Sequence, residues 1–486
     1  MRPCEEATIR ATRVDRRCAE RDKRWALAAA VLGSTMSFLD ESIVNVALPK
    51  IETDLSTTLP AMQWVVNAYT LCMSALILSA GAAADRLGRR RIFLTGIAIF
   101  ATASVACGFA PRVALLVVAR AIQGLGAALL IPCSLAIIGA AFTEKERGAA
   151  IGIWSGASAI AAGGAPLLGG WLVDHVSWRA IFLINPLLAG PTIWIAIRHV
   201  QESRDPAAPD RLDWSGAALV FAALVGLTYG LITASTRGWS DSSVVVALAA
   251  GSSLLFVFLW HERHSRVPMM PLDLFRSHNF TGVNLMTLLL YGALGGAFFF
   301  VPFLLIQAHG YSATAAGAAF LPFTVVLGVL SRSSGRLADR FGARWPLTIG
   351  PVVVALGFLL LVWSSGQRHY WVFLVPLTVL GFGMAITVAP LTTLVVNSVP
   401  ESKTGIASGI NNAVASVASL LAISALGTVA LSVYNGALAR HSQVSGPPAS
   451  VRATASIDMF RSVMSIAALL GVASAGVAAL TIRDTR

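Results

Sequence analysis

The chain has 486 residues, of which 56% are hydrophobic and 12% charged, and its mean hydropathy of +0.72 exceeds what a water-exposed globular surface tolerates. A net charge of +12 suits a nucleic-acid partner only on a folded soluble surface. No stretch between the apolar runs is long enough for such a domain, which excludes nucleic-acid binding and an enzyme in a separate soluble domain. The lipid bilayer is the expected solvent, and we expect neither a cofactor nor a metal site.

Fourteen apolar runs follow one another along the chain, and each approaches the roughly 20 residues that cross a bilayer as a helix. The sequence therefore predicts an all-α polytopic membrane protein. The expected spans are residues 25–47, 61–83, 92–110, 113–139, 147–173, 179–198, 213–234, 243–261, 280–307, 314–337, 345–364, 370–396, 404–432 and 459–481.

The basic residues give an orientation, because cytoplasmic loops hold most Lys and Arg. With the amino terminus inside, 27 of the 36 Lys and Arg lie in inner segments and 8 in outer loops. Both termini are then cytoplasmic. Because the inner loops are basic and no organelle signal is recognised, we expect the bacterial cytoplasmic (inner) membrane. The 32 arginines against four lysines indicate a GC-rich bacterial genome.

A short motif occurs twice, 254 residues apart, as Gly81, Asp85, Arg86 and Gly88 and as Gly335, Asp339, Arg340 and Gly342. Parallel repeats with a site between them are one known plan of membrane carriers. The predicted order is a cytoplasmic basic tail (1–24), a six-helix bundle (25–198), a cytoplasmic linker (199–212), two inserted helices (213–262), a cytoplasmic loop (263–279), a second six-helix bundle (280–481) and a cytoplasmic tail (482–486).

Two ionisable residues are expected at membrane depth, where a charge costs roughly 2.5 to 3.5 kcal/mol and usually has a function. Asp40 lies 15 residues into the first span, and Arg120 lies seven residues into the fourth, which runs the other way. At about 1.5 Å per residue they reach similar depth, so we predict a buried pair. Burial favours the neutral acid and a nearby arginine the carboxylate, so alternation between the two environments would load and release a proton. A static structural pair is the alternative, and Glu41 is either a second titrating group or an interfacial residue.

The fifth span carries small residues and a proline on one helix face, which allows close approach of a neighbouring helix and adds a bend. These are Gly152, Gly156, Ala159, Gly163, Pro166 and Gly170, followed by the Gly169–Gly170 ending. We interpret the face as a hinge and seal between the bundles, against the alternative of ordinary small-residue packing.

The loop after the second span, with Arg86 and Arg89 among its arginines, is explained in part as a positive-inside anchor. A positive-inside anchor does not explain Asp85. An acid among arginines at a helix end suggests a latch to a helix terminus or to a basic side chain across the bundle. Its copy at Asp339, next to Arg340, favours this gating role.

Polar and aromatic residues within the spans are candidate substrate contacts, each with packing or helix–helix hydrogen bonding as the alternative. As a set they describe a mostly apolar cavity suited to lipophilic solutes. The candidates are Asn45, Trp64, Asn67, Tyr69, Gln123, Trp154, Asn185, Asn284, Tyr291, Asn411 and Asn412.

These motifs resemble, along nearly the whole chain, those of the fourteen-helix drug:proton antiporters of the major facilitator superfamily. The segment 81–90 is similar to the family's loop signature, the segment 120–128 to its proton-transfer motif in helix 4, and the segment 39–49 to its helix-1 motif, with Asp40 as the acid. The helix-5 antiporter motif is matched at Gly152, Pro166, Gly169 and Gly170. The resemblance implies the major facilitator fold with helices arranged 6+2+6.

The sequence departs from that family at several positions. Ala161 and Ala165 stand where glycines are expected, Glu41 where a small residue is usual, Ala83 where a larger apolar residue is usual, and Ser416 where relatives often carry a basic residue. The remaining matches in the fifth span support antiport.

The expected function is efflux of lipophilic, and for some substrates cationic, small molecules such as drugs or endogenous metabolites in exchange for protons, by a monomer driven by the proton gradient. An uncoupled or proton-symport uptake carrier for a small metabolite is the alternative, and it would need neither the acid of the first span nor the helix-5 pattern. A receptor or scaffold would require a soluble domain or an interaction tail that the chain lacks.

Overall fold

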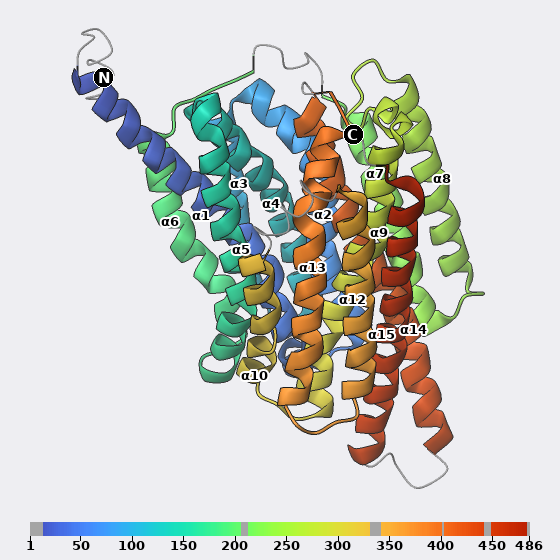
Figure 1. Cartoon of the computed structure of the whole chain (residues 1–486). Helices are drawn as coiled ribbons and strands as arrows, with labels where there is room; N and C mark the ends of the chain where they lie inside the picture. The colour runs from blue at the N-terminus through green and yellow to red at the C-terminus, as the bar shows by residue number, and fades with distance from the viewer. Residues whose placement is uncertain (1–12, 206–211, 331–341, 401–402, 442–448, 484–486) are drawn as a thin grey trace.

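The computed structural model describes residues 13–205, 212–330, 342–400, 403–441 and 449–483. Within these residues the chain is helical, and fourteen helical stretches are long and apolar enough to cross a membrane (Figure 1). The predicted all-α fold with fourteen spans is confirmed. Both the start of the first helix and the end of the last lie at one end of the helix bundle, which we call the terminal face, and the other end is the opposite face.

The helices of the first half and of the insertion follow the predicted order. They are α1 (Arg13–Asp54), α2 (Leu59–Leu87), α3 (Arg89–Gly108), α4 (Val113–Ala141), α5 (Glu144–His175), α6 (Ala180–His199), α7 (Trp214–Arg237) and α8 (Ser242–His264).

The second half begins with a 3₁₀ turn and contains one π-helical turn. Its elements are η2 (Leu272–Arg276), α9 (His278–Phe303), η3 (Leu304–Ala308), α10 (Ala313–Ala318), the helical stretch 321–330, α12 (Arg344–Ser364), α13 (Trp371–Asn397), α14 (Thr404–His441) and α15 (Ala449–Thr481).

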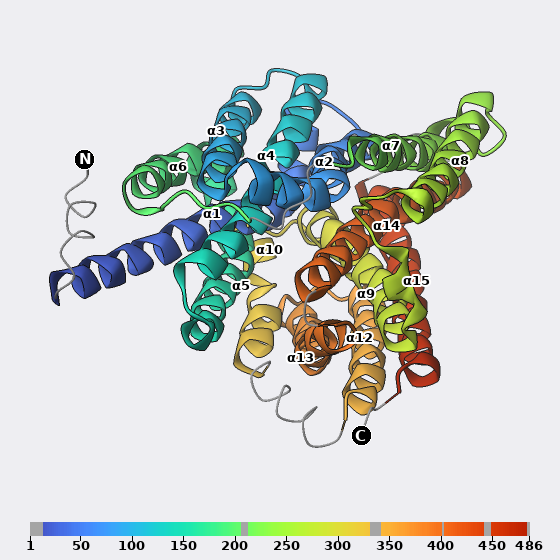
Figure 2. The same ribbon diagram turned by 90° about the horizontal axis from the view of Figure 1, so that it is seen from above.

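Packing within each half is dense. α2 lies against α4, α3 against α4 and α1 against α5 and α6, while in the second half α12 lies against α13 and α15, and α9 against α14 and α15. The inserted helices α7 and α8 pair with each other, and α7 also contacts α2 and α14 at the edge where the halves meet (Figure 2).

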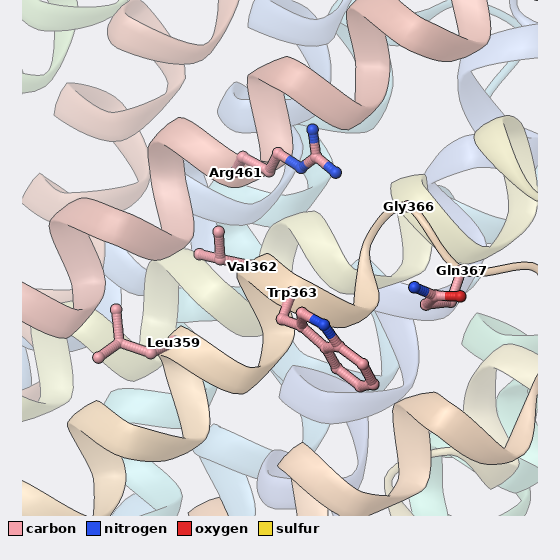
Figure 3. Close-up of a pocket in the computed structure, with 6 residues that line it drawn as sticks. All are labelled: Leu359, Val362, Trp363, Gly366, Gln367 and Arg461. Carbon is pink, nitrogen blue, oxygen red and sulfur yellow. The ribbon is translucent and has the colours of Figure 1, made fainter.

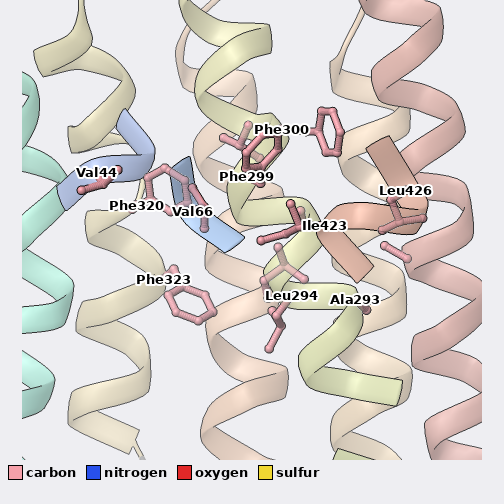
Figure 4. Packing of buried hydrophobic residues seen from close by; sticks show 14 of the residues in the cluster. Val44, Val66, Ala293, Leu294, Phe299, Phe300, Phe320, Phe323, Ile423 and Leu426 are labelled. Atoms are coloured by element: carbon pink, nitrogen blue, oxygen red, sulfur yellow. The ribbon is translucent and has the colours of Figure 1, made fainter. Parts of the chain in front are cut away.

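A shared apolar cluster joins the two halves. Val44 of α1 and Val66 of α2 lie in the same buried cluster as Phe320, Ile423 and Leu426 (Figure 4). Because apolar burial is non-directional, such a contact can be exchanged for another as the halves move. The halves are therefore held together here by packing, and direct hydrogen bonds add to it, such as that from Asn67 Nδ2 to Ser424 Oγ at 2.9 Å.

Several predicted boundaries differ from the structure. α1 begins at Arg13 instead of residue 25, α14 continues to His441 and α15 begins at Ala449, so residues predicted as a long loop between spans continue as helix. These extensions carry polar residues and so escape a hydropathy criterion, although their backbone hydrogen bonds continue the helix. The predicted span 314–337 is broken between α10 and residue 321, and its end lies outside the described residues.

Candidate functional site

The first half encloses a fully buried carboxylate. Asp40 of α1 is 0% exposed and its Oδ2 pairs with Nη1 of Arg120 from α4, which is 1% exposed. Its Oδ1 accepts hydrogen bonds from Gln123 Nε2 at 2.8 Å and from Asn185 Nδ2 at 2.9 Å. The structure thus brings together Asp40 and Arg120, which were predicted to pair because they lie at similar depth in antiparallel spans. The three side chains that bond to the carboxyl group all donate to it.

A second layer fixes the orientation of this pair. Arg120 Nε donates to Val65 O at 3.2 Å, and the guanidinium lies 4.2 Å from the centre of the Tyr69 ring. Ser104 Oγ accepts from Gln123 at 3.2 Å and from Asn185 at 2.9 Å, and donates to Phe182 O at 2.8 Å. Ser104 was missed from the sequence, because a single serine in an apolar helix carries no pattern.

Glu41 follows Asp40 but lies outside this network. Its side chain is partly buried and has no hydrogen bond or ion pair among the described residues. Adjacent helix positions point about 100° apart. Glu41 therefore takes no part in the hydrogen bonds that surround Asp40.

The loop motif after α2 is held within the first half. Gly88 has a φ of +116°, which a glycine adopts without strain, and it turns the chain from α2 into α3. Asp85 Oδ1 accepts from Arg89 Nε at 2.9 Å. In the second half Gly342 also has a positive φ, 82°, which matches the sequence repeat at that glycine, while Gly335, Asp339 and Arg340 lie outside the described residues.

An unexpected carboxylate caps α3. Glu202, from the segment after α6, accepts from the backbone nitrogens of Arg90 at 3.0 Å and Arg91 at 3.2 Å. A side chain at Gly88 would collide with it, because a Cβ there would lie 2.8 Å from the Glu202 carboxyl. Acidic groups at a helix N-terminus satisfy free N–H groups and complement the helix dipole. The linker is thereby fastened to the loop motif, with Arg86 exposed beside it.

At the opposite face a carboxylate connects the two halves. Asp174, near the end of α5, accepts from Ala313 N at 3.1 Å, from Thr314 N at 2.7 Å and from Thr314 Oγ1 at 2.6 Å. Beside it Gln307 Nε2 donates to Glu52 Oε2 at 2.7 Å. Asp174 thus caps the first turn of α10 from the other half, a role that sequence alone did not reveal.

The small-residue face of α5 is packed at one end only. A Cβ at Gly170 would lie 2.2 Å from Ala313 O, and one at Gly317 would lie 2.0 Å from Pro166 O, so the backbones of α5 and α10 touch near the opposite face. A Cβ at Gly152 or Gly156 would meet nothing within 4 Å. Along α5, contact with α10 is therefore confined to the end near the opposite face, and the glycines toward the terminal face have no neighbour among the described residues. Gly169 packs on Ile43 of α1 instead.

Six of the polar candidates for substrate contact are paired with other side chains, in three groups. Tyr69, Gln123 and Asn185 belong to the Asp40 network, as described above. Asn284 and Asn411 bond to each other, with Asn411 Nδ2 donating to Asn284 Oδ1 at 3.1 Å. Asn67 bonds to α14 across the halves.

Of the remaining candidates, Trp154 also joins two helices. Asn412 is exposed, and Trp64 and Tyr291 are partly exposed. Asn45 Oδ1 has no hydrogen-bond partner among the described residues. Trp154 is partly buried and donates from Nε1 to Ser34 Oγ at 2.8 Å, which ties α5 to α1.

Two surface hollows accompany these sites. One, of about 310 Å³, lies between the halves at the opposite face and includes Lys50, Asp174 and Gln307 in its lining. The other, of about 650 Å³, lies between α12 and α15 on the second half, with Trp363 and Arg461 at its wall (Figure 3). Neither reaches Asp40, which is sealed inside the first half.

Among the described residues, fourteen helices able to cross a membrane form two halves, and one half encloses a buried charged pair, which is the architecture of polytopic membrane transporters. The Major Facilitator Superfamily model matches residues 30–423, and the chain belongs to that superfamily. It is therefore a multi-pass membrane transporter of small molecules and not an enzyme.

Curated relatives cover most of the chain. It is 37% identical over 422 residues to Multidrug resistance protein Stp of Mycobacterium tuberculosis, covering 87% of this chain and 78% of that protein. It is 35% identical to the Tetracenomycin C resistance and export protein of Streptomyces glaucescens, covering 84% and 76%. It is 32% identical to the Methylenomycin A resistance protein of Bacillus subtilis, covering 83% and 86%.

Solved structures share the fold at low identity. A bacterial homologue of the lysosomal transporter Spinster, in an inward-facing and unoccupied conformation, aligns with a TM-score of 0.65 at 18% identity over 95% of this chain and 97% of that one. The xylose transporter XylE from E. coli, in an inward open conformation, gives 0.61 at 15% identity over 95% and 96%. These likenesses confirm the predicted major facilitator fold.

Proposed function

We propose that this chain exports lipophilic small molecules, including cationic ones, in exchange for protons by alternating access. The observation that carries the proposal is the buried pair of Asp40 and Arg120, enclosed by Gln123 and Asn185. A buried ion pair is a weak source of stability but a suitable switch, because either partner alone is costly to bury. The names of the relatives, which are resistance and export proteins, support efflux as the direction.

The environment of Asp40 suggests which step of the cycle this conformation represents. Its two oxygens receive hydrogens from three side chains, and a protonated carboxyl would place a hydrogen against one of those donors. We assign the conformation to the state after proton release. Loading a proton would weaken the contact with Arg120 and leave the guanidinium bound to Val65 O, Gln123 Oε1 and the Tyr69 ring.

The terminal face is the proposed cytoplasmic face, because the inner segments hold 27 of the 36 basic residues. The open end of the α5 glycine face then points to the cytoplasm. A conformation that has released its proton and faces inward is the one expected to accept substrate in an exporter. Both termini would lie in the cytoplasm, and we propose a monomer in the bacterial cytoplasmic membrane.

Gating is proposed at two places. At the opposite face, the cap from Asp174 to α10 and the contact of Gly170 with Ala313 hold the outer side closed. At the terminal face, Asp85 is occupied by Arg89 of its own half in this conformation. We propose that it exchanges this partner when the inner side closes, with Gly152 and Gly156 receiving a helix of the second half.

Substrate contact is proposed for the four candidates without a helix pairing in the described part of the chain and for Trp154, which bonds to Ser34 but is only partly buried. These are Asn45, Trp64, Trp154, Tyr291 and Asn412. Aromatic faces with a few amides give apolar binding with orientation, and an aromatic ring also attracts a cation. The same two halves, with α7 and α8 outside them, form the proposed 6+2+6 division.

The proposal is tested by transport in liposomes that contain the purified protein and a set of lipophilic cations and neutral drugs. An imposed pH gradient, acidic on the outer side, should drive accumulation in the outer compartment, and an uncoupler should abolish it. One proton crossing the membrane potential contributes about 2.3 kcal/mol per 100 mV. Solute movement that follows only its own gradient, unaffected by the uncoupler, would support an uncoupled carrier instead.

A further inference from the structure

A second group of buried carboxyls lies in the inserted helix pair, at the terminal face. Asp213 caps α7, with Oδ1 accepting from Gly216 N and His261 Nε2 each at 2.9 Å. Glu262, one position after His261 on α8, accepts from Met270 N into Oε2 at 2.9 Å. The Asp213 side chain is 7% exposed and Glu262 is 2% exposed. Neither group contributes to the Asp40 network.

The remaining oxygen of each carboxyl has no donor. Asp213 Oδ2 and Glu262 Oε1 are buried and lack a hydrogen-bond partner among the described residues. They face the same point: a Cβ built on Gly216 would lie 2.7 Å from Asp213 Oδ2 and 2.8 Å from Glu262 Oε1. Gly216 therefore leaves the space in which these two oxygens approach each other.

Two ionised carboxylates in this position would be unstable. Desolvation penalises each charge, and like charges in contact penalise each other. His261, 30% exposed, is the titratable neighbour on α8, and it faces the other oxygen of Asp213. Within the described part of the chain, no lysine or arginine forms an ion pair with either acid. A single proton held between the two unpartnered oxygens supplies the missing donor to both.

We propose that Asp213 and Glu262 form a proton-binding site, a carboxylic acid hydrogen-bonded to a carboxylate, at the terminal end of the inserted helices. The pair binds and releases its proton as a unit, as coupled carboxyls do. This site is separate from the proposed transport site, because it lies on α7 and α8 and shares no residue with the Asp40 network.

The site is connected to the first half. Glu262 holds the backbone of Met270, and the neighbouring Met269 Sδ accepts from Ser79 Oγ of α2 at 3.6 Å. α7 itself packs against α2 and α14. Loss of the proton would set two carboxylates against each other and loosen the segment that joins α8 to α9. The insertion would thus respond to the pH at its own face of the membrane.

The test is infrared difference spectroscopy of the full-length protein in lipid nanodiscs, titrated from about pH 6 to about pH 9, where unperturbed carboxyls are ionised throughout. The wild type should show the C=O stretch of a protonated acid, which shifts in D₂O and disappears as the pH rises. Glu262→Gln should remove this band, while Asp40→Asn and the matched acid Glu52→Gln should retain it. A band that survives in both Glu262→Gln and Asp213→Asn would overturn the proposal.

A second readout guards against a misfolded variant. The amide of Glu262→Gln can donate to Asp213 Oδ2 and so replace the shared proton, which should preserve the fold. The wild-type thermal unfolding midpoint should fall as the pH rises through the titration of the band, and that of Glu262→Gln should stay flat over the same range. Equal slopes in the two proteins would also contradict the shared proton. Transport is measured separately, so a failed efflux assay would leave this result unaffected.

Discussion

Asp174 of α5 accepts two hydrogen bonds from Thr314, one from its backbone nitrogen at 2.7 Å and one from its hydroxyl at 2.6 Å. One carboxylate of the first half thereby caps a helix of the second. In an alternating-access carrier such a contact must break when the opposite face opens. Its strength then sets part of the balance between the two conformations.

Asp174→Ala should shift that balance toward opening at the opposite face. A helix cap is worth about 1 kcal/mol, which corresponds to a change of about fivefold in the equilibrium. Spin labels at Ile153 of α5 and Val329 of the stretch 321–330, both exposed, should report a larger population of short distances. Asp241→Ala is the matched control, because Asp241 caps α8 within the insertion. If the control shifts the distances equally, the cap on α10 has no special role.

Glycine substitutions along α5 should act differently at its two ends. Gly170→Ala places a Cβ against Ala313 O and should force α5 and α10 apart at the opposite face, reducing transport strongly. Gly156→Ala meets no atom within 4 Å and should leave this conformation stable. It should instead disfavour the conformation closed at the terminal face. The same labelled pair measures both effects. If the two variants behave identically, the two ends of α5 do not seal the two faces in alternate conformations.

Glu202→Ala should weaken the attachment of the linker to the loop motif. The variant leaves the backbone nitrogens of Arg90 and Arg91 without their acceptor, so we expect a loss of about 1 kcal/mol, as for other helix caps. Thermal unfolding of purified protein measures the change. Glu202→Gln keeps one acceptor oxygen and should lose less. A variant as stable as the wild type would show that solvent replaces the cap without cost.

His309 should make the protein sensitive to acid at the opposite face. Burial among aromatic rings lowers the pKa of His309 below its usual value near 6.5, and its Nε2 lies 3.0 Å from Ser365 O. The neutral form is thus favoured by folding. The stabilisation from neutral His309 is fully present above the pKa of this residue in the unfolded chain. It is lost as the pH falls through the pKa of His309 in the folded protein. The unfolding midpoint should drop below about pH 6.5 in the wild type and less in His309→Gln, and parallel curves would contradict this assignment.

The sequence predicted the spans well, because hydropathy reports directly on burial in lipid. It also predicted the contact of Asp40 with Arg120, because counting along two antiparallel helices fixes depth. It did not predict the cap from Asp174, since acids are common at helix ends and only the approach of α10 distinguishes this one. Nor could it separate Asn284 and Asn411, which bond to each other, from Asn412, which is exposed, because the rotation of each helix is set by its neighbours. The roles of these residues in transport stay predictions.

The most direct test of the proposed mechanism is the proton release that accompanies substrate binding by purified protein in weakly buffered solution. Molecules that still carry the coupling proton on Asp40 must lose it to reach the substrate-accepting conformation. A lipophilic cation should therefore release protons from the wild type and none from Asp40→Asn, in which Arg120 keeps Gln123 and the Tyr69 ring as partners. Substrate should still bind the variant, which separates coupling from binding. Equal proton release from both proteins would contradict the assignment of the coupling site to Asp40.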